Sequence, residues 1–232
     1  MENFTLSNDW KFFEMSKMHF EKVIKADERL AELNQRKRER QPASPAQSTP
    51  ATEPLVVIDA DFVSEINKEL LIQRMIIHED GIRTVVLAAM CLEAIINLYG
   101  VMQKSSKHYD KYLDKLSHKQ KWVVVPKYFT AEEFPTDGQA FEALGKLLTF
   151  RNEIVHSKPT NVDITGKDGL GAVNDEISEQ DQTYTRNTRN AMKALLLCTG
   201  ELHRISPDFR PLHYYQPSHL DEYEELANAA GL

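Results

Sequence analysis

The stretch Val85-Val-Leu-Ala-Ala-Met-Cys-Leu-Glu-Ala-Ile-Ile-Asn-Leu-Tyr99 decides the fold of this chain. Only Glu93 and Asn97 interrupt its apolar residues, and these two positions stand one helical turn apart. The stretch lacks the regular alternation of polar and apolar residues that is typical of a half-buried strand. We therefore expect a strongly apolar helix in the core of a helical protein.

Helical patterns also dominate on both sides of this stretch, and strand patterns are nearly absent. Expected helices cover residues 8–40, 62–78, a segment centred on Leu92, then 109–116, 122–129, 139–155, 188–203 and 221–229. We expect Asp80-Gly-Ile82 to separate the second and third helices, Thr130-Ala-Glu-Glu133 to cap a brief helix, and 161–182 to form an exposed loop. These patterns predict an all-α protein with an antiparallel four-helix-bundle core, an appended N-terminal helix and a short C-terminal helix.

Four regions follow from the same patterns. We expect an N-terminal helical extension over 1–40, a flexible linker over 41–54, the helical bundle over 55–205 and a C-terminal extension over 206–232. The linker is rich in Pro, Ala, Ser and Thr and cannot form a core.

A candidate site lies in Leu147-Leu-Thr-Phe-Arg-Asn-Glu-Ile-Val-His-Ser-Lys-Pro159, where Arg151, Asn152 and His156 close an amphipathic helix. Histidine can pass protons near neutral pH, and arginine can hold a phosphate through two parallel hydrogen bonds. These residue types therefore suit phosphodiester cleavage. The spacing is also common by chance, and a histidine at a helix end is more often a capping or packing residue.

Two further motifs precede this one in a fixed order. Leu-Glu-Ala-x-x-Asn ends at Asn97, Lys-Trp-x-x-x-Pro spans Lys121 to Pro126, and Arg-Asn-x-x-x-His follows. In order and spacing the three motifs resemble the HEPN superfamily, over roughly Val63 to Ile205. The resemblance implies an HEPN-like bundle that acts as a metal-independent endoribonuclease, as toxins and phage-defence effectors of that superfamily do. It also implies a homodimer, because active members bring two copies of the Arg/His motif into one cleft.

Carried over residue by residue, Arg151 would stabilise the phosphate, Asn152 would orient it and His156 would act as general acid or base. Glu93 would orient Arg151, although a structural ion pair is an equal alternative. Many toxin members paired with an antitoxin carry a modified Tyr where this chain has Lys158, which puts that regulation in doubt and offers another phosphate contact. The alternative function is a catalytically inactive HEPN-like module for protein interaction or nucleotide binding.

The net charge of −7 indicates that any RNA affinity must come from a local basic surface. Lysines gather between Lys104 and Lys127, and we expect Lys115, Lys119 and Lys121, together with Lys158, to contact RNA. A solvated helix face is the plainer interpretation of the same run.

The remaining features bear on cofactors and compartment. Cys91 and Cys198 lie in apolar helical runs and predict reduced core thiols, as in a cytoplasmic protein. No signal peptide or membrane-spanning stretch is expected, and no cofactor or metal site, since phosphate-binding Gly-rich motifs and metal-ligand spacings are missing. The expected partners are RNA, a second copy of the chain and an antitoxin or regulatory protein.

The N-terminal helix carries an aromatic face from Trp10 to Ile24 that is too apolar to remain in water. We expect it to pack on a bundle of the dimer. The length of the linker leaves open whether that bundle belongs to the same chain or to its partner.

Overall fold

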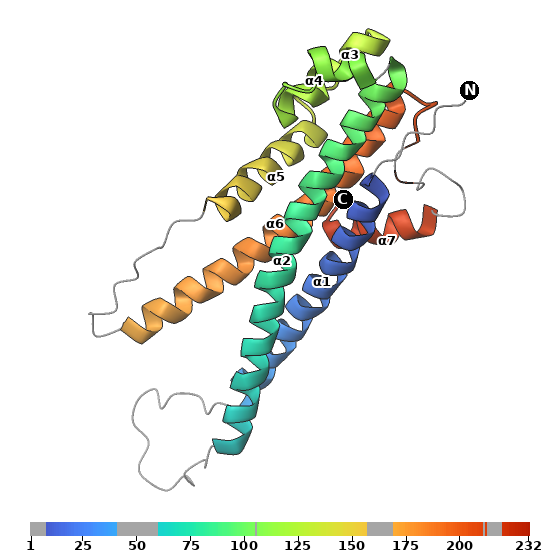
Figure 1. Cartoon of the computed structure of the whole chain (residues 1–232). Helices are drawn as coiled ribbons and strands as arrows, with labels where there is room; N and C mark the ends of the chain where they lie inside the picture. The colour runs from blue at the N-terminus through green and yellow to red at the C-terminus, as the bar shows by residue number, and fades with distance from the viewer. Residues whose placement is uncertain (1–7, 41–59, 105, 157–168, 211, 213–219) are drawn as a thin grey trace, which may run out of the picture.

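The computed structural model describes residues 8–40, 60–104, 106–156, 169–210, 212 and 220–232. Every regular element in these ranges is an α-helix, which confirms the all-α prediction (Figure 1). The helices are α1 (Asp9–Arg40), α2 (Ala60–Gln103), α3 (Ser106–Tyr112), α4 (His118–Thr130), α5 (Gln139–Val155), α6 (Gly169–Ile205) and α7 (Leu220–Ala230). The predicted bounds of the first helix are confirmed at both ends to within one residue.

The long helices α1, α2 and α6 run side by side, and α5 packs on α6 (Figure 1). The short helices α3 and α4 cover the C-terminal end of α2 (Figure 1). The apolar stretch that ends at Tyr99 forms the centre of the core, because Leu92, Ile95 and Ile96 have no exposed surface. This burial confirms that the stretch is a core helix.

The helix α1 belongs to the same core. Its Phe13 and Phe20 are at most 1% exposed and lie in one apolar cluster with residues of α2, α5 and α6. Val23 and Leu33 extend the contact along α2 in two smaller clusters. The structure thus seats the N-terminal helix on the bundle of its own chain.

The predicted break at Asp80-Gly-Ile82 is wrong, since α2 runs through it without interruption. Asp80 is held by His19 of α1, whose Nδ1 lies 2.5 Å from the carboxylate oxygen Oδ1. Gly81 is buried, and a Cβ added there would stand 3.0 Å from Thr188 Oγ1. The glycine therefore permits a close approach of α6 rather than ending the helix.

The predicted loop over 161–182 is wrong for its described part, because α6 already begins at Gly169. Residues 161–168 lie outside the described ranges. A contact distant in sequence stabilises the polar start of α6: Asp181 is 4% exposed and lies 3.0 Å from Arg74 Nε and 3.3 Å from His78 Nε2.

The predicted helix cap at Thr130 is wrong. Thr130 ends α4 instead of capping a new helix, and the capping box lies earlier, between Ser117 and Gln120.

The expectation that no stretch is long and apolar enough to cross a membrane is wrong for α2, which meets both criteria over Asp61–Gln103. Half of its most apolar window is buried in the fold, and the core helix of a soluble protein meets the same criteria.

Candidate functional site

A pocket of about 370 Å³ lies between α2, the start of α4 and α5. We call it the Arg151 pocket. Its polar side chains come from all three helices and are Glu93, Ser117, His118, Lys119, Thr149, Arg151 and Asn152. Three motif-derived candidates, Arg151, Asn152 and Glu93, therefore share one surface with the predicted RNA contact Lys119.

Arg151 and Asn152 lie near the C-terminal end of α5, and both are exposed. Arg151 Nη1 donates a hydrogen bond of 3.0 Å to Asn152 Oδ1. Within the described part of the chain, this hydrogen bond occupies only one guanidinium nitrogen of Arg151, and the other nitrogens can bind a ligand. An exposed guanidinium beside an amide is an arrangement that can hold a phosphate group.

His156 closes α5 without entering the Arg151 pocket. Its backbone N–H donates to the carbonyl oxygen of Asn152 at 2.9 Å, and its side chain is exposed. The described residues that line the pocket do not include it. One chain thus brings Arg151 and Asn152, the predicted phosphate ligands, into one pocket. It leaves His156, the predicted proton-transfer group, outside the lining of that pocket.

Glu93 faces Lys121 within the described part of the chain: the two charged groups are 3.6 Å apart. Glu93 shares the Arg151 pocket with Arg151, yet its ion pair is with the lysine. This geometry therefore favours a structural ion pair as the role of Glu93 over the orientation of Arg151.

The four predicted RNA-binding lysines divide by burial. Lys115 and Lys119 are exposed, whereas Lys121 is only 3% exposed. The Lys121 ammonium points inward because it donates to Asn97 Oδ1 at 3.0 Å and faces Glu93 and Asp114. A buried, paired ammonium is not available to a nucleic-acid backbone. Lys158 lies outside the described residues.

The sequence motifs missed His118, the first residue of α4, which lines the Arg151 pocket. Burial lowers the pKa of His118 to about 4; Lys121 and Arg151 act in the same direction, and Glu93 opposes them. Its Nε2 is buried without a hydrogen-bond partner in the described ranges. The imidazole is therefore neutral at neutral pH, and a neutral imidazole can accept a hydrogen bond. The capping box at Ser117 was the one local signal that could have placed it at a helix start.

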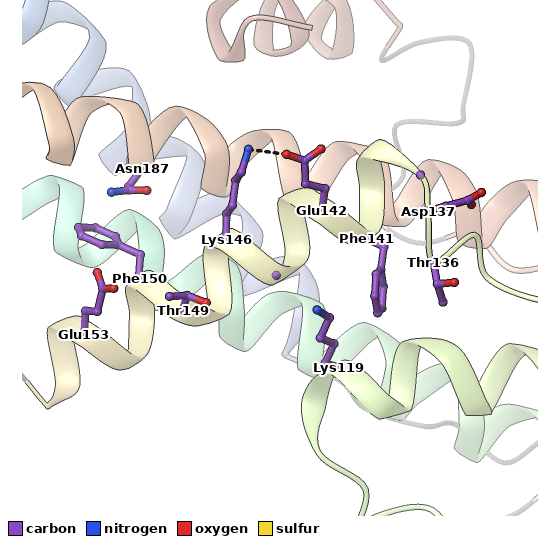
Figure 2. A pocket seen from close by; sticks show the side chains of 12 residues that line it. Lys119, Thr136, Asp137, Phe141, Glu142, Lys146, Thr149, Phe150, Glu153 and Asn187 are labelled. Atoms are coloured by element: carbon purple, nitrogen blue, oxygen red, sulfur yellow. Dashed lines mark ion pairs between the residues drawn. The ribbon is translucent and has the colours of Figure 1, made fainter.

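A second pocket of about 670 Å³ is also lined by Lys119, and we call it the Phe141 pocket (Figure 2). The Lys119 ammonium stands 4.4 Å from the centre of the Phe141 ring. Lys146 and Glu142 form an ion pair at 2.6 Å across one turn of α5 (Figure 2). No sequence motif indicated this pocket, because its residues come from α4, α5, α6 and the turn before α5.

Among the described residues, no group of three or more His, Cys, Asp or Glu side chains is placed to hold a metal ion. In comparisons with known proteins, no protein-family model, curated protein or solved structure matches this chain.

Proposed function

We propose that this protein is a metal-independent endoribonuclease of the HEPN type that acts as a homodimer. One observation carries the proposal: the Arg151 pocket gathers Arg151, Asn152, Lys119 and the neutral imidazole of His118. Cationic donors beside a proton acceptor are the groups that cleavage of an RNA phosphodiester needs.

The reaction would proceed by attack of a ribose 2′-oxygen on the adjacent phosphorus. A bond forms between the 2′-oxygen and phosphorus, and the bond from phosphorus to the 5′-oxygen breaks. The products are a 2′,3′-cyclic phosphate and a 5′-hydroxyl. Arg151 and Lys119 would stabilise the charged phosphorane, with Asn152 as a further donor. One histidine accepts the proton of the 2′-hydroxyl, and another protonates the leaving 5′-oxygen.

The position of His156 supports a site shared by two copies. The side chain is exposed and does not line its own chain's pocket, and in a dimer the partner's His156 would supply this group. Exposed apolar side chains accompany the pocket and His156: Met90 lines the Arg151 pocket, and Val155, which is 53% exposed, precedes His156. Leu71, Ile72 and Met75 are 45–59% exposed further along α2. Such side chains suit burial against a second copy.

An RNA-cleaving dimer of this kind fits a growth-arresting toxin or a phage-defence effector in the cytoplasm. Its activity would then be restrained by an antitoxin or a regulatory protein. The two buried free thiols, Cys91 and Cys198, are compatible with a reducing compartment.

The test compares wild type with His156→Ala and Arg151→Ala, measuring cleavage of RNA in the presence of EDTA and cell growth after expression. We expect each variant to cleave about 100-fold more slowly or worse, because each loses a group that acts in the transition state. Lys11→Ala, which removes an exposed lysine of α1 outside both pockets, is the control and should cleave like wild type.

The second candidate is an inactive HEPN-like module that binds another protein or a nucleotide. The exposed apolar side chains of α2 favour it as much as they favour a homodimer. Absence of RNA cleavage by wild type, together with equal growth for wild type and His156→Ala, would exclude the nuclease and favour this second function.

A further inference from the structure

The Arg151 pocket and the Phe141 pocket adjoin along α5. Both are lined by Lys119, Gly145 and Thr149, so the two pockets meet at these residues. Gly145 lies at the junction, where an added Cβ would stand 3.3 Å from Lys119 Nζ. A glycine here leaves room for the Lys119 ammonium at the junction of the two pockets.

The two pockets differ in charge. The Arg151 pocket presents Arg151 and Lys119 toward a ligand, which suits a phosphate. The Phe141 pocket carries three carboxylates, those of Asp137, Glu142 and Glu153 (Figure 2). These acidic side chains would repel a phosphate but can accept hydrogen bonds from the amino groups of a nucleobase.

Aromatic surface in the Phe141 pocket fits the same ligand. Phe141 lies partly buried beside Lys119, whereas Phe150, at the far end near Asn187, is only 9% exposed and packs edge to face on Tyr184 (Figure 2). Aromatic rings bind the bases of single-stranded nucleic acids by stacking, with little regard to sequence. A cavity of about 670 Å³ is within the size range of ligand pockets.

We propose that the Phe141 pocket binds the base of a nucleotide next to the scissile phosphate of single-stranded RNA. The proposal rests on the proposed function and adds a base subsite to it. The base displaces the Lys119 ammonium from the Phe141 ring, and the lysine then turns to the phosphate that links the two nucleotides. Lys119 thus lies at the junction of the phosphate and base subsites and contacts the phosphate once the base is bound.

The test blocks the junction without removing any polar group. Gly145→Gln fills the space at the junction of the two pockets. Gly145→Ala is the matched control, because a single methyl group requires only a small shift of the flexible end of Lys119. Phe141→Ala removes the stacking ring in a second, independent variant. The probes are a non-cleavable 2′-O-methyl RNA of about ten nucleotides and the same backbone without bases, each measured by fluorescence anisotropy with the full chain.

We expect wild type and Gly145→Ala to bind the base-bearing probe about tenfold more tightly than the abasic one. Gly145→Gln and Phe141→Ala should lose this preference, whereas Arg151→Ala should weaken binding of both probes alike. A preference that survives in Gly145→Gln and Phe141→Ala, or is missing in wild type, overturns the base subsite.

Cleavage of unmodified RNA by the same proteins separates the two proposals. Cleavage by wild type without a base preference would remove the subsite and leave the nuclease. A base preference that depends on Gly145, in a wild type that does not cleave RNA, would leave the subsite and remove the nuclease.

Discussion

Lys121 Nζ donates a hydrogen bond of 3.0 Å to Asn97 Oδ1 and so joins α4 to α2 beside the Arg151 pocket. The hydroxyl of Tyr109 donates to the same oxygen at 2.5 Å, which ties α3 to the same point. The ammonium is buried, and Glu93 and Asp114 face it at 3.6 and 3.7 Å. One amide oxygen therefore holds two short helices on the end of the central one, and with them the start of α4 that carries His118.

Removing the acceptor should cost more than removing the ammonium. Asn97→Leu leaves a buried charge without its hydrogen bond, and we expect unfolding free energy to fall by about 3 kcal/mol. Lys121→Met leaves Asn97 bonded to Tyr109 and should cost about 1 kcal/mol. Urea denaturation of both single variants measures the two losses.

The double variant completes a thermodynamic cycle. Because the two side chains are in contact, Asn97→Leu with Lys121→Met should be less destabilised than the sum of the single variants by about 1 kcal/mol or more. Additive losses would mean that the ammonium and the amide do not stabilise each other.

Two helical glycines should respond in opposite ways to the same substitution. A Cβ at Gly100 would lie 2.4 Å from Cε2 of the buried Tyr109 ring, whereas at Gly145 it meets only the end of Lys119. Alanine favours a helix over glycine by about 0.5–1 kcal/mol, so Gly145→Ala should raise the melting temperature. Gly100→Ala should lower the melting temperature, because the Tyr109 ring must move. We expect it to reduce the free energy of unfolding by about 1–3 kcal/mol. Thermal unfolding of both variants settles the comparison, and equal shifts would contradict the packing at Gly100.

The contact between α1 and α2 depends on a buried pair. Asp80 accepts from His19 at 2.5 Å, and its side chain is only 9% exposed. We expect Asp80→Ala to cost about 3 kcal/mol, because the buried imidazole loses its partner. Glu79→Ala is the neighbouring control: Glu79 pairs with Arg83 at the surface, where an ion pair contributes about 0.5 kcal/mol. Similar unfolding midpoints for the two variants would show that this pair does not hold α1 in place.

Local pattern was sufficient to predict the all-α class and the central core helix. The stretch from Val85 to Tyr99 has no alternation and almost no charge, so it had to be buried whatever its neighbours. The contact of Asn97 with Lys121 also brings together two of the three motifs on which the HEPN resemblance rests. These two motifs are thus in contact where α4 packs on α2.

What the sequence could not indicate depends on partners far along the chain. Asp80 and Gly81 look like a helix break, but His19 and the close approach of α6 decide otherwise. Lys121 stands in a run of lysines and looks exposed until its partner on α2 is known. His118 was hidden in the same way, because the groups that enclose it come from three helices.

The buried imidazole of His118 should make stability depend on pH. Glu93 of α2, Arg151 of α5 and Lys121 of its own helix surround it, and burial is the largest cause of its pKa of about 4. The unfolded chain binds a proton there below about pH 6.5, whereas the folded chain does not until about pH 4. Lowering the pH through this window therefore favours unfolding, and above it the contribution is constant.

At pH 5 this loss should reach about 2 kcal/mol relative to pH 8. His118→Gln cannot take up the proton, so its unfolding free energy should fall by that much less over the same range. Urea denaturation at several pH values gives both profiles. If His118→Gln follows the wild-type profile, the imidazole takes up protons as readily in the folded chain as in the unfolded one, and its neutral role in the pocket is lost.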